Sequence, residues 1–129
     1  MENNFSLNDE LFFIYGTLKK GHRNHHMFDR FAKFQGDVQT IFKYPMFDIG
    51  DGFPYLQNNV GEGNIILGEL YQIDKRFHSK IDYFEAVPTL YKRGEIKVLT
   101  EDNEILKVNV YFKSKELLIE DLNLMNEWR

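Results

Sequence analysis

The distribution of apolar residues along the chain predicts a strand-rich protein. Six segments have the length and apolar content of strands: residues 11–15, 34–44, 55–56, 64–73, 91–99 and 105–112. The first is continuously apolar up to Gly16, which is typical of a strand buried on both faces. Gly68, inside the fourth, indicates a bulge or a tight bend. The last two alternate in polarity around a polar turn at 100–104 and are expected to form a hairpin.

Apolar residues with helical spacing occur in three short segments: residues 24–33, 74–84 and 113–129. The second segment has the clearest pattern, because Phe77, Ile81 and Phe84 fall on one helical face. We expect Asp74 to cap the start of this helix and Pro88 to prevent its continuation. The chain is therefore expected to combine many strands with about three short helices.

Length and composition narrow the possible classes of protein. The 129 residues fit a single domain, and we expect one domain over residues 1–129 with a loose polar tail at 1–9. The chain has 0 Cys, which excludes disulfides, thiolate metal sites and a cysteine nucleophile. Its net charge of −4 provides no basic surface for nucleic acid. No apolar run reaches the roughly 20 residues that cross a bilayer, and no signal peptide is evident, so we expect a cytoplasmic protein.

The first strand runs directly into a turn at residues 15–21, here called the glycine loop. Glycine at position 16 permits a positive φ, and such a turn can direct consecutive backbone N–H groups at an anion. The loop is not a nucleotide-binding P-loop, because His22 and Arg23 stand where that motif has Lys and Ser or Thr. On its own the loop is most simply an ordinary strand-ending turn. The basic residues in and after it could be solvated or could attract an anionic substrate.

Glu85 stands at the predicted end of the 74–84 helix, next to Phe84, Val87 and Pro88. Apolar surroundings and the negative end of the helix dipole both disfavour an ionised carboxylate. We therefore expect a raised pKa, which suits a carboxylate that acts first as general base and then as general acid. The alternative is a solvated glutamate, the commoner situation for any one of the 20 acidic residues.

Several other side chains are candidates for a site. A possible metal-binding cluster follows the glycine loop: His22, His25, His26 and Asp29. The segment has no HExxH pattern and His22 precedes the predicted helix, so we expect no metal there. The aromatic residues, 16% of the chain, are mostly core material. Three of them could also line a pocket: Tyr55, Tyr83 and Tyr91.

Two motifs occur in order along the chain. The first is the glycine loop, and the second is residues 81–85 followed by Pro88, Tyr91 and Arg93. Together they resemble the gamma-glutamylcyclotransferase-like (AIG2-like) family, and within it the gamma-glutamylaminecyclotransferase branch. The similarity extends over residues 11–112. The Gly-Thr-Leu sequence of the loop differs from the Gly-Ser-Asn type of the glutathione-cycle branch, so a gamma-glutamyl amino acid is a less expected substrate.

The resemblance implies an α+β fold, a small mostly antiparallel β-barrel with flanking short helices and a cavity at one end. It also implies that Glu85 is the catalytic carboxylate. The backbone of four consecutive residues would bind the glutamyl moiety: Tyr15, Gly16, Thr17 and Leu18. We expect Tyr55 and Tyr91 to contribute to the same substrate-binding site. The implied reaction releases 5-oxoproline and a free amine from a gamma-glutamyl amine or amide, a small molecule, without a cofactor.

This reaction suits a chain with no cysteine, because the α-amino group of the substrate attacks the substrate's own side-chain carbonyl. One carboxylate with a pKa near neutrality can move the protons. Two alternatives remain at this point. The chain could be a non-catalytic small-ligand binding domain on the same fold, or a hydrolase that frees glutamate from the same amides.

Overall fold

The computed structural model describes residues 9–22, 24–28, 32–50, 52–115 and 123–128. Its strands are β1 (Asp9–Ile14), β2 (Ala32–Tyr44), β3 (Met46–Phe47), β4 (Tyr55–Leu56), β5 (Asn64–Asp74), β6 (Tyr91–Thr100), β7 (Ile105–Lys113) and β8 (Leu124–Met125). Its helical elements are the 3₁₀ helices η1 (His25–Phe28) and η2 (Lys75–Phe77) and the α-helix α1 (His78–Phe84).

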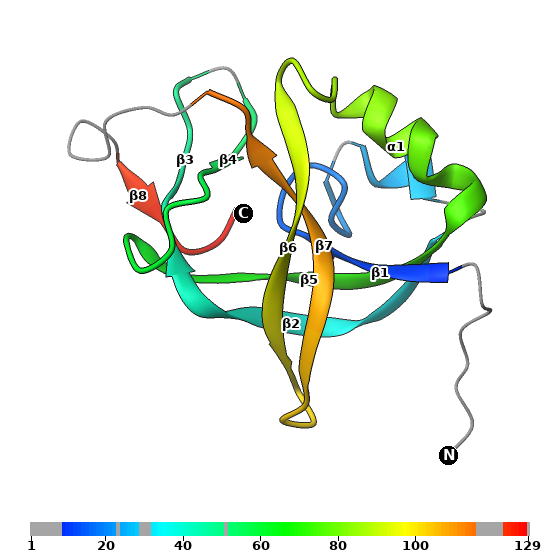
Figure 1. Cartoon of the computed structure of the whole chain (residues 1–129), viewed down its shortest axis with the longest axis horizontal. Coiled ribbons are helices and arrows are strands. Elements are labelled where there is room, and N and C mark those ends of the chain that lie inside the picture. Colours follow the sequence, from blue (N-terminus) through cyan, green and yellow to red (C-terminus); the bar gives the residue numbers. More distant parts are fainter. Residues whose placement is uncertain (1–8, 23, 29–31, 51, 116–122, 129) are drawn as a thin grey trace.

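Five strands close into a barrel in the order β1-β5-β2-β6-β7, with β7 returning to β1 (Figure 1). Neighbouring strands are antiparallel except β1 and β7, which are parallel. The fold class expected from the sequence, an α+β protein built on a small mostly antiparallel β-barrel, is confirmed. A three-stranded sheet in the order β4-β3-β8 lies beside the barrel, and α1 lies on another side (Figure 1).

Strand β1 is buried on both faces, as its continuous apolar sequence predicts. Phe13 belongs to the cluster inside the barrel, together with residues of the other barrel strands such as Val98. Phe12 and Ile14 belong to a second cluster, which includes Ile81 of α1. Successive side chains of a strand point to opposite faces, so β1 holds the barrel interior and the helix together. Its C-terminal end, where the glycine loop begins, is thereby fixed relative to α1.

Gly68 lies where β5 passes close to β1. A Cβ at this position would be 2.6 Å from Phe13 Cε1, a distance that side chains do not tolerate. Its pairing with Val38 of β2 is in regular register. The glycine therefore permits a close approach of backbone and ring, and the bulge considered from the sequence is not found at this position.

The structure contains the helical segment predicted over 74–84 and a short 3₁₀ helix within the segment predicted over 24–33. The 74–84 segment begins as η2 and continues as α1, and the Asp74 side chain accepts a hydrogen bond from the Arg76 N–H, which confirms the predicted cap. In the described part of the 24–33 segment, η1 covers His25–Phe28 and the chain is in β2 from Ala32, while residues 29–31 lie outside the described ranges. No helix in the described ranges is long and apolar enough to cross a membrane.

The C-terminal helix predicted over 113–129 is not found where the chain is described. Leu124 and Met125 form strand β8, in which Met125 pairs with Met46 of β3. Leu124 and Met125 thus pair with β3 as a strand, an arrangement that depends on residues far away in sequence. Residues 116–122 of the predicted helix, and residues 1–8 of the predicted tail, lie outside the described ranges.

Candidate active site

Glu85 occupies the C-terminal cap of α1. Its backbone N–H donates to Ile81 O at 2.9 Å. The next residue, Ala86, has a φ of 53°, and its carbonyl accepts a hydrogen bond of 2.8 Å from the Leu90 N–H. The chain therefore turns sharply after the helix and enters β6 at Tyr91. This turn brings Glu85, Leu90 and Tyr91 to the same place.

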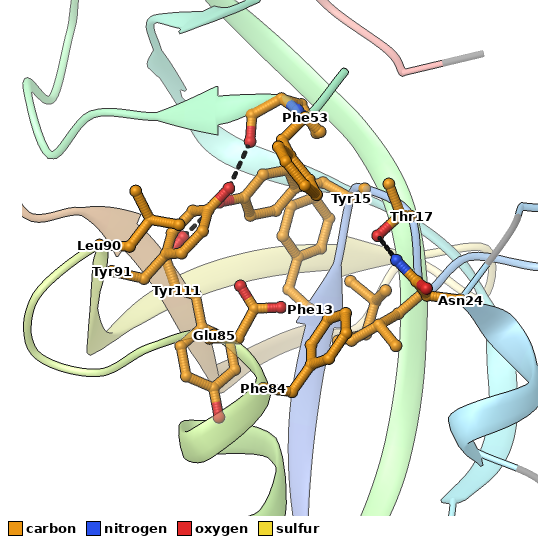
Figure 2. Close-up of a pocket in the computed structure, with 14 residues that line it drawn as sticks. Phe13, Tyr15, Thr17, Asn24, Phe53, Phe84, Glu85, Leu90, Tyr91 and Tyr111 are labelled. Carbon is orange, nitrogen blue, oxygen red and sulfur yellow. Dashed lines mark hydrogen bonds between the residues drawn. The ribbon is translucent and has the colours of Figure 1, made fainter. Parts of the chain in front are cut away.

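A cavity of about 370 Å³ opens at this place. Its wall comes from the end of β1 and the glycine loop, from residues 53–54 before β4, from the end of α1, and from β6 and β7. Figure 2 shows the Glu85 carboxylate pointing into the space between these segments. Side chains far apart in sequence are thus gathered around one carboxylate.

The structure brings together six of the seven predicted site residues on this wall: Tyr15, Gly16, Thr17, Leu18, Glu85 and Tyr91. Tyr55 is not among the residues that line the cavity. Its ring stacks on the Tyr91 ring, with centroids 5.7 Å apart, so it contacts a residue of the cavity wall. Tyr83 is 88% exposed, so the expectation that it lines a pocket is wrong.

Burial raises the pKa of Glu85 to about 7, and the negative charge of Asp82 adds to the rise. The direction expected from the sequence is confirmed. The charge of Asp82, one turn earlier on α1, was not part of that expectation, which invoked the helix dipole. A carboxyl group with this pKa is about half ionised at neutral pH, so it can both accept and donate a proton.

Asp82 is held in place by two residues of the β6–β7 hairpin. The Tyr111 hydroxyl donates to Asp82 Oδ1 at 2.7 Å, and Arg93 Nη2 lies 3.6 Å from Asp82 Oδ2. Burial and the contact with Asp82 raise the pKa of Tyr111, so this hydroxyl keeps its proton and remains a donor. The charge that acts on Glu85 is therefore in a fixed position.

Gly16 is required by a contact and not by its φ. Positive φ occurs in the glycine loop at Gly21, where it is 79°, but not at Gly16, so the positive φ that glycine permits is not adopted at position 16. A Cβ on Gly16 would lie 2.9 Å from Pro54 Cγ. The absence of a side chain lets the glycine loop pass against the segment before β4, which closes the cavity on that side.

Hydrogen bonds fix the conformation of the glycine loop. The Gly16 carbonyl accepts from the Lys19 N–H at 3.0 Å, and the Thr17 carbonyl accepts from the Asn24 N–H at 3.0 Å. Asn24 Nδ2 also donates to Thr17 Oγ1 at 2.8 Å (Figure 2). Within the described part of the chain, no hydrogen bond uses the backbone N–H of Thr17 or Leu18. These two donors belong to residues that line the cavity.

One of the residues considered as metal ligands, His25, supports the glycine loop. His25 Nδ1 lies 2.8 Å from Leu18 O, and the His25 ring contacts Phe28 edge-on at 6.1 Å between centroids. In the ranges that the structure describes, no group of three or more His, Asp or Glu side chains could hold a metal ion. Asp29 lies outside those ranges.

The two lysines of the glycine loop differ in exposure, because Lys19 is buried and Lys20 is exposed. Lys19 is buried, and its Nζ donates to Trp128 O at 2.7 Å. Lys20 Nζ lies 3.4 Å from the centroid of the Phe34 ring. Neither lysine lines the cavity beside Glu85, so the structure does not support attraction of a substrate by these two charges.

Sequence reasoning did not assign Phe53, Leu90 or Tyr111 to the site. Tyr111 pairs with Arg93 across the hairpin, and the alternation along β7 indicates which of its residues share a face. The alternation does not indicate that the face of β7 that carries Tyr111 lies next to Glu85. Phe53 and Leu90 reach the cavity only through the path of the turns before β4 and β6, for which the sequence carries no periodic signal.

The comparisons with known proteins agree with this architecture. The profile of the family described as "Gamma-glutamyl cyclotransferase, AIG2-like" matches residues 12–129. The chain belongs to this family. Gamma-glutamylaminecyclotransferase of Homo sapiens is 37% identical over 98 residues, which cover 71% of this chain and 64% of the human protein. Gamma-glutamylaminecyclotransferase A of Danio rerio is 36% identical over 109 residues, covering 79% of this chain and 68% of the fish protein.

A crystal structure of an AIG2-like protein from Mus musculus superposes on this AIG2-like chain with a TM-score of 0.87. The two sequences are 26% identical, and the match covers 95% of this chain and 89% of the mouse chain. The chain spans only 56% of the gamma-glutamylaminecyclotransferase of Bos taurus, at 36% identity. The family and its fold are therefore established, as is a relation to enzymes of the cyclotransferase type.

Proposed function

We propose that this AIG2-like protein is a cyclotransferase that releases 5-oxoproline and a free amine from a gamma-glutamyl amine or amide. One observation carries the proposal. Glu85, with a pKa of about 7, faces a cavity whose wall includes the backbone of the glycine loop. The names of the related proteins from Homo sapiens and Danio rerio support the same reaction class.

The proposed reaction needs proton transfer but no external nucleophile. The α-ammonium of the substrate loses a proton to Glu85, and the resulting amine attacks the γ-carbonyl carbon. A new C–N bond closes the five-membered ring, and the C–N bond to the outgoing amine breaks. In total the α-nitrogen gives up two protons and the outgoing nitrogen takes up two, so no water, oxidant or cofactor is consumed. General acid–base catalysis of this kind typically contributes about 10²–10⁴-fold.

The glycine loop has a second role in this proposal. The N–H groups of Thr17 and Leu18 are donors beside the cavity, and the substrate brings two anionic groups, its α-carboxylate and the developing oxyanion. Donors in fixed positions stabilise such charge strongly in a site from which water is excluded. Holding the glutamyl chain folded back on itself also removes much of the entropic barrier to ring closure. The cavity volume of about 370 Å³ suits a small-molecule substrate.

The test is incubation with a panel of gamma-glutamyl amines, with detection of 5-oxoproline and glutamate by mass spectrometry. We expect 5-oxoproline, and we expect Glu85→Gln to release it at least about 100-fold more slowly while the fold is retained. Glu104→Gln, in the exposed turn between β6 and β7, is the matched control. Glutamate as the product would indicate a hydrolase. A thermal shift with the substrate but no product would indicate a binding domain.

A further inference from the structure

Lys19 of the glycine loop is buried although its side chain carries a charge. It is 6% exposed and lines a second cavity, of about 350 Å³, that Glu69 and Glu127 also line. Its Nζ donates to Trp128 O at 2.7 Å, a contact between residues 109 positions apart in the sequence. A buried ammonium is costly unless it is hydrogen-bonded or paired, so the placement of Lys19 depends on this acceptor. The proposed reaction does not use this side chain.

The carbonyl of Trp128 belongs to a segment that is fixed to the barrel. Met125 pairs with β3, and the Leu67 N–H of β5 donates to Asn126 O at 2.8 Å. The Trp128 side chain packs against the cluster inside the barrel. Figure 1 shows this end of the chain, drawn in red, returning from β8 toward the blue glycine loop. The segment 124–128 therefore offers the lysine an acceptor in a defined position.

The backbone of Lys19 closes the turn that carries two donors of the cavity wall. Its N–H donates to Gly16 O at 3.0 Å, which closes a turn whose central residues are Thr17 and Leu18. Within the described chain, no hydrogen bond uses the N–H of either central residue, and both residues line the candidate active-site cavity. A shift of Lys19 would therefore reorient the peptide groups that carry these donors.

Resting on the proposed cyclotransferase activity, we propose that Lys19 is a positioning residue and that the segment 124–128 supports the active site through it. The ammonium ties one end of the turn to the barrel by way of Trp128 O, and strand β1 ties the other end. The N–H groups of Thr17 and Leu18 are thereby held ready for the anionic groups of the substrate. Lys19 does not line that cavity, so it acts through the turn. Donors that are already in position bind charge without the cost of ordering a loop.

Lys19→Met removes the ammonium and keeps a side chain of similar length. We expect KM for release of 5-oxoproline to rise at least about fivefold, and by a larger factor than kcat falls, because the donors of the turn lose their anchor. KM does not depend on the folded fraction of a preparation, so a purely structural role would lower only the apparent kcat. Lys97→Met, at an exposed position of β6, controls for the loss of one positive charge and should keep the wild-type KM. A wild-type KM in Lys19→Met would overturn the proposal.

Trp128→Ala tests the route through the segment 124–128. Without the indole ring, the carbonyl that accepts from Lys19 is less firmly held, so KM should rise in this variant too. If Lys19 acts through this carbonyl, the double variant should have about the same KM as Lys19→Met alone. Increases in KM that multiply would show that Lys19 acts independently of the segment, and would overturn its assignment as a support of the active site.

Hydrogen exchange measured by mass spectrometry tests the anchor without any turnover. The N–H groups of Lys19 and His22 are hydrogen-bonded within this part of the chain. Peptides that cover residues 16–22 should exchange faster in Lys19→Met than in the wild type or in Lys97→Met, and unchanged exchange would overturn the anchoring by Lys19. If the wild type released no 5-oxoproline, the proposed function would fail, and the exchange result would still decide whether Lys19 fixes the turn.

Discussion

The hydroxyl of Tyr111 donates a 2.7 Å hydrogen bond to Asp82, which stands one helical turn before Glu85. Arg93 Nη2 holds the other carboxylate oxygen of Asp82 at 3.6 Å. Asp82 in turn raises the pKa of Glu85, with an effect second to that of burial. The hairpin β6–β7 thus influences the proton affinity of Glu85 through a residue that does not line the cavity.

This relationship predicts the effect of Asp82→Asn on the pH profile. The proposed reaction begins with ionised Glu85, so kcat/KM should fall as pH decreases through the pKa of about 7. Without the charge at position 82, the ionised form of Glu85 is favoured and this acid limb should move to lower pH, by up to about one unit. Asp102→Asn, in the exposed turn between β6 and β7, should leave the limb in place. An unshifted limb in Asp82→Asn would contradict the proposed coupling.

The same raised pKa predicts how stability depends on pH. Burial raises the pKa of Glu85 from 4.5 to about 7 in the folded protein. A carboxyl group of this kind contributes stability that is fully present below its unfolded-state pKa and is lost as pH rises through about 7. Glu85→Gln cannot lose a proton. As pH rises from 4.5 to 8, the wild type should therefore lose stability relative to Glu85→Gln. The difference between their free energies of unfolding should change by up to about 3 kcal/mol.

Urea unfolding of both proteins at pH 4.5, 6 and 8 measures this change. Glu104→Gln, whose side chain is exposed, controls for the loss of one acidic residue from the chain. A Glu85→Gln difference that stays constant with pH would show that the carboxylate ionises as easily in the folded chain as in the unfolded one.

Much of the fold and part of the site follow from local sequence. The apolar run of β1 and the alternation of β6 and β7 are properties of short segments, and the structure contains these strands where they are expected. Glu85 could be singled out because its apolar neighbours and its place at the end of a helix are also local. Its pKa has the expected direction for the expected reason, burial.

Long-range contacts explain what the sequence does not reveal. The apolar residues of segment 113–129 have helical spacing, yet Met125 pairs with Met46 of β3 and belongs to a strand. Tyr55 does not line the cavity, and its ring stacks on the ring of Tyr91, a residue 36 positions away that does line it. Position 16 likewise requires glycine because a side chain there would collide with the ring of Pro54, which is 38 positions away in the sequence. None of these contacts leaves a periodic trace in the chain.

The contact between Gly16 and Pro54 predicts the outcome of a double-mutant cycle. In Gly16→Ala the new Cβ would lie 2.9 Å from Pro54 Cγ, so the glycine loop or the segment before β4 must shift. We expect a loss of about 1–3 kcal/mol in free energy of unfolding, typical of overpacking, and at least a tenfold lower kcat/KM.

Pro54→Ala removes the ring atoms that the new Cβ would meet. The double variant should therefore recover part of what Gly16→Ala loses, measured by urea unfolding and by 5-oxoproline release. Strictly additive losses would show that the two positions do not interact and that another neighbour explains the glycine.

Glu69 holds the glycine loop in position through a hydrogen bond with its backbone, so substitution of Glu69 should affect substrate binding. It is 9% exposed, and its Oε1 accepts from the Lys20 N–H at 2.9 Å and from the Tyr71 hydroxyl at 3.0 Å. Glu69→Leu would leave both donors without this acceptor, which costs about 1–3 kcal/mol of stability for a buried group. Because the glycine loop is proposed to bind the substrate, KM should rise by a larger factor than kcat falls. Glu69→Gln keeps an acceptor oxygen of the same reach and should restore most of both quantities. A Glu69→Leu variant that loses stability but keeps the wild-type KM would limit Glu69 to a structural role.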